Sequence, residues 1–223
     1  LRYGIMQLRC PVDVTIYDAQ GTCVAEIKND ALVSAAERVG VFIEKDRKTI
    51  CLPLDGQQYR LEVSGYADGT MDVQYYGFES GSMAELESYR TIPVSAGETS
   101  ASVNLAAGSL ALTDGAGAAL SPQIAAAGEA LTTHNVAAVD TQDVYMVGTG
   151  AYYHGAYASL SAHYLGEEDL VFAGWYSGDT LLSRDYVLSV QVLEDMTVEA
   201  RYVPASELPP AITAADRTAD GIQ

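Results

Sequence analysis

Apolar and polar residues alternate along most of this chain, and a period of two is typical of β-strands with one buried face. The clearest runs in the first half are 12–16, 59–63, 71–75 and 101–105. Turn-forming Asp-Gly pairs at 55–56 and 68–69 separate some of these runs. Many short strands with regular turns predict an all-β sandwich over residues 1–105, which a last strand or hairpin could extend to about residue 120.

The alternation weakens after the first hundred residues and then resumes near residue 144. Three further runs show it: 159–164, 188–192 and 198–202. These runs predict a second β-domain over residues 140–203. Residues 106–139 are dominated by Ala, Gly, Ser and Thr, so we expect a connector with some structure there. Residues 204–223 contain three prolines and no periodicity, which predicts a linker or a tail.

The only tryptophan, Trp175, lies in the run LVFAGWYSGDTLLS. Strand alternation places Val171 and Ala173 on the same face as Trp175, and Phe172 and Tyr176 on the other. Because the first face is apolar throughout, we predict that the indole is buried and that its N–H reaches a backbone carbonyl or water. Tyr176 is then expected to be the exposed ring. The expected neighbours of the indole are apolar residues of the adjacent runs: Leu160, Ala162, Leu188 and Val190.

The net charge of the chain limits its possible partners. The chain has 30 acidic and 12 basic residues and a net charge of −18, which would repel phosphate backbones and anionic lipids. We therefore expect no nucleic-acid partner. No apolar run approaches the ~18 residues of a membrane span, so no membrane insertion is expected, and we expect a monomer. The chain starts without Met or a signal-peptide pattern, which indicates a piece of a longer or processed protein.

Tyrosine is unusually frequent, with 15 Tyr against three Phe. Tyr combines an apolar ring with a hydroxyl that can stay hydrated, so it suits half-exposed sheet faces and surfaces that meet partners. Cross-strand packing is the favoured interpretation, and a patch for sugar or protein is the alternative. The candidate patch comprises six residues: Tyr75, Tyr76, Phe78, Tyr152, Tyr153 and Tyr176.

Motifs for catalysis are absent from the sequence: it has no nucleophile elbow, HExxH, phosphate-binding loop or calcium loop. The three histidines, His134, His154 and His163, form no recognisable triad with a distant Ser and Asp. We therefore expect no enzyme activity, no cofactor and no metal ligand set. The acidic cluster 167–169 favours a solvated turn, with weak Ca²⁺ binding as the alternative.

The three cysteines, Cys10, Cys23 and Cys51, cannot all pair within one chain, and their spacing matches no zinc pattern. Each lies in an apolar, strand-like run. We therefore expect small buried thiols rather than a disulfide framework.

Several motifs of the second domain resemble the bacterial surface repeat related to the internalin B repeat, a small β-grasp-like unit of Gram-positive secreted proteins. The matching segments are GTG at 148–150, YHG at 153–155, the run 158–164, FAGWY at 172–176 and MTVEARY at 196–202. The resemblance implies a β-grasp-like fold, with α+β as an alternative class. The first domain resembles, through 10–27 and 59–76, β-sandwich accessory domains of Gram-positive surface proteins.

These resemblances imply a non-catalytic spacer and adhesion or interaction fragment, located outside the cell or on its surface. Its expected partner is a host or cell-wall protein or glycan. Two alternatives remain open at this point. One is a carbohydrate-binding accessory region of a larger surface hydrolase, and the other is a hydrolase in its own right.

Overall fold

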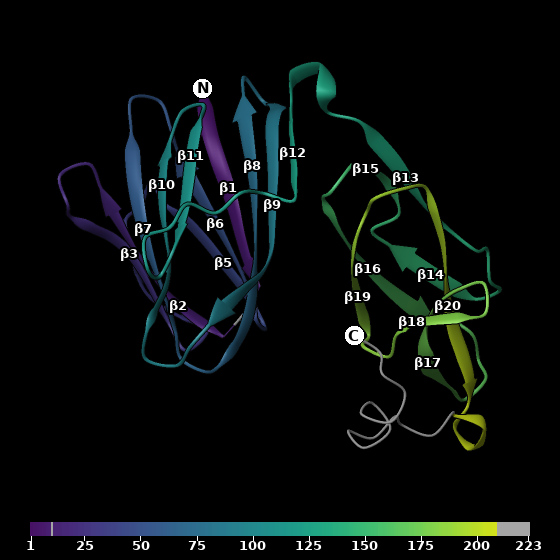
Figure 1. The fold of residues 1–223 in the computed structure, drawn as a ribbon. Helices are drawn as coiled ribbons and strands as arrows, with labels where there is room; N and C mark the ends of the chain where they lie inside the picture. Colours follow the sequence, from purple (N-terminus) through teal and green to yellow (C-terminus); the bar gives the residue numbers. More distant parts are fainter. Residues whose placement is uncertain (10, 209–223) are drawn as a thin grey trace. The chain divides into compact units, whose positions relative to one another are not determined.

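The computed structural model describes residues 1–9 and 11–208. The chain divides into two units, Leu1–Thr132 and Thr133–Gln223, each built from β-strands (Figure 1). Over the described residues, the helical elements are two 3₁₀ turns, η1 (Gly128–Ala130) and η2 (Ala205–Glu207). The predicted all-β class is therefore confirmed. Neither turn is long or apolar enough to form a membrane-crossing helix.

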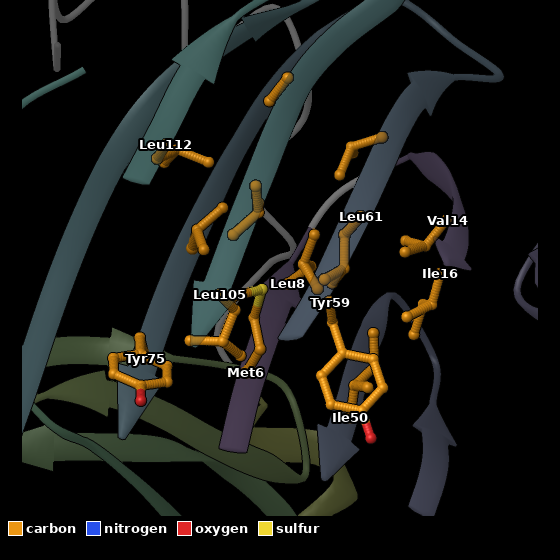
Figure 2. Close-up of a cluster of buried hydrophobic side chains, with 14 of the residues drawn as sticks. Met6, Leu8, Val14, Ile16, Ile50, Tyr59, Leu61, Tyr75, Leu105 and Leu112 are labelled. Atoms are coloured by element: carbon orange, nitrogen blue, oxygen red, sulfur yellow. The ribbon is translucent and has the colours of Figure 1, made fainter. Parts of the chain in front are cut away.

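The first unit is a β-sandwich of two antiparallel, six-stranded sheets. In spatial order, the first sheet contains β12 (Ile124–Ala127), β9 (Ser82–Val94), β8 (Gly69–Glu79), β1 (Arg2–Arg9), β6 (Arg47–Pro53) and β5 (Gly40–Glu44). The second contains β11 (Ser109–Asp114), β10 (Thr99–Ala106), β7 (Gln58–Gly65), β2 (Val12–Asp18), β3 (Cys23–Lys28) and β4 (Ala31–Ala35). Alternate residues of the two sheets meet in one core (Figure 2).

That core explains why the alternating runs form strands. Met6 and Leu8 on β1 and Val14 and Ile16 on β2 are fully buried, while the residues between them are partly exposed. Burying one such side chain contributes roughly 1.5–3 kcal/mol. Because a shift by one residue would expose every apolar side chain of a strand, the pattern also fixes the register.

Within the expected connector 106–139, β11 lies where a last strand of the sandwich was predicted, whereas β12 and β13 (Thr133–Ala138) were not expected. β11 pairs with β10 and β12 pairs with β9, so both are edge strands of the sandwich. An edge strand is held largely by backbone hydrogen bonds, so the small residues IAAA of β12 suffice to form one. The sandwich therefore extends to Thr132. The second unit starts at Thr133 with β13, before the expected boundary at 140.

The second unit contains a five-stranded and a three-stranded sheet. The first, in spatial order, consists of β15 (Gly150–Tyr153), β13, β20 (Met196–Pro204), β17 (Leu170–Ser177) and β18 (Thr180–Ser183), and the second of β14 (Val144–Val147), β16 (Tyr157–Tyr164) and β19 (Val187–Gln191). β13 and β20 are parallel, and all other pairs are antiparallel. The described part of this unit has no α-helix, so its class is all-β; its relation to the β-grasp stays a prediction.

Trp175 is fully buried at the centre of the second core, as predicted. Its Nε1 donates a hydrogen bond to the backbone carbonyl of Tyr186 at 3.3 Å, so the expected partner of the indole is also confirmed. The four predicted apolar neighbours belong to the same cluster or pack against it.

The predicted faces of β17 need correction, because the strand contains a β-bulge. The pairing of β17 with β20 shifts between Phe172 and Gly174, and Gly174 has φ of 144°. An extra residue reverses the alternation, so Phe172 lies on the core side with Trp175, their ring centroids 5.8 Å apart. Tyr176 is half-buried rather than exposed, with the guanidinium of Arg201 4.1 Å from its ring centroid.

Candidate functional site

The six residues of the expected aromatic patch are divided between the units, three in each. Tyr75 is fully buried in the sandwich, and its hydroxyl donates a hydrogen bond to Glu85 Oε1 at 3.1 Å. Burial, and then the charge of Glu85, raises the pKa of Tyr75. Tyr76 is also buried, with its hydroxyl bonded to Gln74. A core position gives a ring no access to a ligand, so both residues leave the expected patch.

The other four residues are half-buried. Phe78 stacks on Tyr3 with centroids 4.7 Å apart, and the Tyr152 hydroxyl donates to the carbonyl of Gly148 at 2.6 Å. Tyr152 also packs against the second core. Cross-strand and core packing therefore accounts for these rings better than a shared binding patch does.

A different group of rings lies on the outer face of the sheet β14-β16-β19. Tyr145 is 60% exposed and stands directly opposite His163 in the pairing of β14 with β16. The Tyr186 hydroxyl lies 2.9 Å from His163 Nδ1, and the two rings meet edge to face at 5.8 Å. Tyr186 is 44% exposed. We call Tyr145, His163 and Tyr186 the aromatic row.

The second core holds the aromatic row in place. The backbone carbonyl of Tyr186 accepts the hydrogen bond from Trp175 Nε1. The Tyr186 ring lies edge to face with Phe172, with their centroids 5.7 Å apart. On β14, Val144 and Met146 pack against the core, so the alternating Tyr145 must face outward. Tyr145 and His163 therefore lie on strands, and Tyr186, in the bend before β19, is held by its contacts with Trp175 and Phe172.

The outer face around the aromatic row carries no Asp, Glu, Lys or Arg at the outward positions of its three strands. Inward positions are identified by burial: Leu160, Ala162 and Leu188 are buried, so the residues between them face outward. The outward positions are Tyr145 and Val147 on β14, Tyr157, Ser159, Ser161 and His163 on β16, and Val187, Ser189 and Gln191 on β19. In a chain with a net charge of −18, these strand positions are uncharged, and the exposed Asp185 lies beside Tyr186 just before β19.

The other two histidines form a pair at the rim of the second core. His134 Nε2 on β13 lies 3.1 Å from His154 Nδ1 in the turn after β15. His154 Nδ1 is also 3.1 Å from the carbonyl of Leu193. Asp195 Oδ1 accepts the backbone N–H of Asn135 at 2.8 Å and lies 3.7 Å from His134 Nδ1. The sequence analysis missed this pair because 20 residues separate its members.

Carboxylates do not gather around a common point in the part of the chain that the structure describes. No group of three or more His, Cys, Asp or Glu residues suited to a metal ion occurs there. Glu167, Glu168 and Asp169 are exposed in the loop between β16 and β17.

The first unit contains an ion pair between the buried Lys48 and the half-buried Asp30. The Lys48 side chain is fully buried, and its ammonium group donates to Asp30, which also accepts the hydroxyl of Tyr66. Burial alone would raise the pKa of Asp30, but the hydrogen bonds from Lys48 and Tyr66 and the lysine charge outweigh it and lower this pKa below its usual value. Lys48 is buried and Asp30, in the β3–β4 turn, is 32% exposed, so the geometry indicates a structural role.

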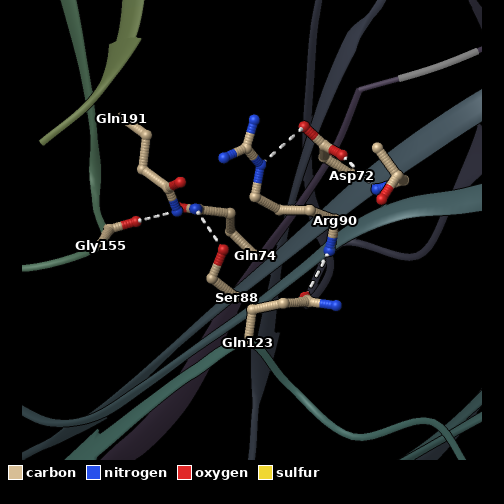
Figure 3. A network of polar contacts seen from close by, with 8 residues as sticks. Asp72, Gln74, Ser88, Arg90, Gln123, Gly155 and Gln191 are labelled. Carbon is tan, nitrogen blue, oxygen red and sulfur yellow. Dashed lines mark hydrogen bonds and ion pairs between the residues drawn. The ribbon is translucent and has the colours of Figure 1, made fainter. Parts of the chain in front are cut away.

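Further polar contacts join strands within each unit (Figure 3). In the first unit, Gln74 Nε2 donates to Ser88 Oγ at 3.1 Å, and Gln123 accepts the backbone N–H of Arg90 at 2.8 Å. In the second, the Gln191 side chain donates to the carbonyl of Gly155 at 3.0 Å. These contacts satisfy polar groups between β-strands and neighbouring turns.

The cysteines differ in exposure. Cys23 is exposed, which corrects the expected buried thiol, because it is the first residue of β3 and follows a turn. Cys51 is half-buried, and burial raises the pKa of its thiol. Both are free thiols, whereas Cys10 lies outside the described residues.

Comparisons with protein-family models, with curated proteins and with solved structures each found no match. The function is therefore inferred from the residues of this chain alone.

Proposed function

We propose that this chain is a non-catalytic spacer and adhesion or interaction fragment of a secreted or cell-surface bacterial protein, and that the aromatic row contacts its partner. The observation that supports this proposal is that the outward positions of β14, β16 and β19 are uncharged, with Tyr145 and Tyr186 exposed on an otherwise acidic chain. Its partner is a host or cell-wall protein or glycan.

The chemistry of the face favours contact with a neutral, polar surface. Burying an unpaired charge in an interface is costly, and the outward positions of these three strands have none to bury. Tyr and Ser together give large, rigid contact areas and adaptable hydrogen bonds. The acidic residues elsewhere repel anionic partners. The aromatic row is thus the part of the second unit best suited to close contact.

The surroundings of the histidines support a non-catalytic role. Hydrolysis by a serine-type mechanism needs a serine nucleophile hydrogen-bonded to a histidine base. His134 is instead bonded to a second imidazole. The Tyr186–His163 pair lies on an outer sheet face, where both residues are exposed.

A neutral glycan is the second candidate partner, as in a carbohydrate-binding accessory region of a larger hydrolase. The observation that favours it is that two exposed tyrosines neighbour the imidazole of His163: Tyr145 opposite it in the sheet, and Tyr186 in contact with it. Aromatic rings can lie flat on the apolar face of a sugar while the imidazole and hydroxyl groups form hydrogen bonds.

Two binding arrays of the intact chain test the proposal, one of neutral glycans that includes cell-wall saccharides and one of host surface proteins. Tyr145→Ser should weaken the binding at least tenfold without changing stability, because the ring is mostly exposed. Phe42→Ser is the matched control, since Phe42 is 62% exposed on the first unit. Binding that survives Tyr145→Ser, or that only Phe42→Ser removes, contradicts the role of the aromatic row. The array on which the intact chain binds identifies the class of partner.

A further inference from the structure

We propose that His134 and His154 form a binding site for a divalent transition metal ion of the zinc class. The sequence alone does not indicate such a site. The evidence for the site is that the second unit brings three donor atoms close together. These atoms are His134 Nε2, His154 Nδ1 and the carbonyl oxygen of Leu193.

The spacing of the two imidazole nitrogens suits a shared ion. With zinc–nitrogen bonds of about 2.0–2.1 Å, two nitrogens on one ion lie about 2.9–3.4 Å apart for right-angled to tetrahedral geometry. His134 Nε2 and His154 Nδ1 are 3.1 Å apart. The carbonyl of Leu193, 3.1 Å from His154 Nδ1, is close enough to act as a third ligand after small movements. Water would complete the coordination.

The donor types also suit a metal ion. A neutral imidazole carries an N–H on one ring nitrogen and a lone pair on the other, and it coordinates a metal ion through the lone pair. When His134 Nε2 and His154 Nδ1 both coordinate, the N–H of each ring lies on its other nitrogen, so neither ring loses a proton. Imidazole ligands favour zinc, copper and nickel, whereas calcium and magnesium prefer oxygen, so the expected ion is a transition metal.

Asp195 occupies the position of a group that supports a metal-binding histidine. Its Oδ1 lies 3.7 Å from His134 Nδ1 and is held by the N–H of Asn135. The negative charge favours a proton on Nδ1, which leaves Nε2 free to face His154. Asp195 is therefore a positioning residue rather than a ligand.

The site is accessible and connects three segments of the unit. The His134 side chain is 26% exposed and that of Asp195 80% exposed, so an ion can enter from solvent. His134 lies on β13, His154 follows β15, and Leu193 precedes β20. An ion bound only by the folded state would raise the stability of this unit.

Calorimetric titration of the full chain with Zn²⁺ under reducing conditions tests the proposal. We expect one equivalent to bind and to raise the melting temperature of the second unit. His134→Gln and His154→Gln should each weaken this binding more than about tenfold, and Asp195→Asn about tenfold. His163→Gln is the matched control and should leave Zn²⁺ affinity unchanged, because its imidazole faces Tyr186.

Paramagnetic NMR of the unaltered chain tests the site without any variant, so poor folding of a variant cannot affect the result. Added Cu²⁺ should broaden the imidazole signals of His134 and His154 first and those of His163 last. No Zn²⁺ binding at millimolar concentration, equal broadening of all three histidines, or full binding by His134→Gln would overturn the proposal. The last outcome would assign the ion to other ligands such as the exposed thiol of Cys23.

Discussion

The two units build their cores in different ways. Among the described residues, the sandwich buries 25 clustered apolar side chains drawn from both of its sheets. The second core has nine, of which three are alanines, and its largest member is Trp175. The first core is therefore redundant, whereas the second depends on one large ring and on the aromatic residues that pack around it.

This difference relates directly to the proposed site. Tyr186 is bonded through its carbonyl to Trp175 and contacts Phe172, so the small core and the aromatic row share residues. In the sandwich, the core is formed by many interchangeable contacts. Truncating one core residue should therefore destabilise the second unit more than it destabilises the sandwich.

The largest effect is expected for Trp175→Ala. Removing a buried Trp costs about 3–5 kcal/mol, whereas a unit of this size is stable by roughly 4–11 kcal/mol. The second unit should unfold or melt far lower, with the sandwich unaffected. Leu61→Ala, which truncates a fully buried residue of the sandwich, is the control and should leave that unit folded at room temperature. Circular dichroism melts and NMR of each unit measure the effects of both substitutions. If the second unit keeps its melting temperature in Trp175→Ala, its core does not depend on this ring.

Asp30→Asn should have the next largest effect, on the sandwich alone, of about 3 kcal/mol, because it leaves the charge of buried Lys48 without its carboxylate. The pKa of Asp30 is lowered in the folded state. The stability it contributes is therefore present above the unfolded pKa of 3.8 and is lost as pH falls through the lower folded value.

Urea unfolding at pH 7 and pH 3 measures this contribution, and Asp30→Asn should reduce the difference between the two conditions. Glu79→Gln is the control, because Glu79 pairs with Arg2 on the surface, where solvent screens the ion pair and it contributes little stability. Equal losses in the two variants would show that burial of Lys48 has no special effect.

Gly174→Ala tests the bulge of β17. A Cβ at this position would lie 2.7 Å from Leu181 Cδ1 and 2.9 Å from the Ser183 carbonyl, with φ at 144°. We expect a loss of about 2–3 kcal/mol from the second unit. Gly81→Ala in the sandwich also has positive φ, 86°, but open space around it, and should cost about 1 kcal/mol. Chemical denaturation compares the two, and a reversed order would contradict the steric argument.

The smallest effects come from two buried tyrosine hydroxyls. Tyr202 donates to the carbonyl of Ala162 at 2.9 Å, and burial, with a smaller effect of Tyr186, raises its pKa to about 12. Tyr202→Phe should cost the second unit about 0.5–1.5 kcal/mol. The Tyr59 hydroxyl has no hydrogen-bond partner among the described residues, so Tyr59→Phe should leave the sandwich unchanged or slightly more stable. Differential scanning calorimetry resolves this contrast, and a larger cost for Tyr59→Phe would be inconsistent with it.

Local patterns were enough to predict the strands and the burial of Trp175. Alternation within a strand depends on residues two positions apart, and this information is present in the sequence itself. It failed at Gly174, because a bulge breaks the period at one residue. It also failed for β12, whose small residues form a strand only because β9 provides a partner.

The candidate sites depend on pairing between distant segments, which a single sequence does not reveal. The row of Tyr145, His163 and Tyr186 requires the register of β14 with β16, and the His134–His154 pair requires β13 beside β15. Alternation places Tyr75 on the apolar face of the run 71–75, cross-strand packing is the favoured interpretation of its ring, and a binding patch is the alternative. The structure places Tyr75 in the core of the sandwich.

The parallel pairing of β13 with β20 also determines how the second unit resists mechanical load. These are the first and last strands of the unit, and they pair from Val136–Met196 to Ala138–Val198. Because parallel strands run in one direction, tension applied between Thr133 and Pro204 pulls the two strands past each other along their length. All hydrogen bonds of the pair then bear the force together, in shear, whereas a hairpin pulled at its open end would break them one at a time. A spacer that transmits tension through this unit would therefore yield only when the whole ladder slips.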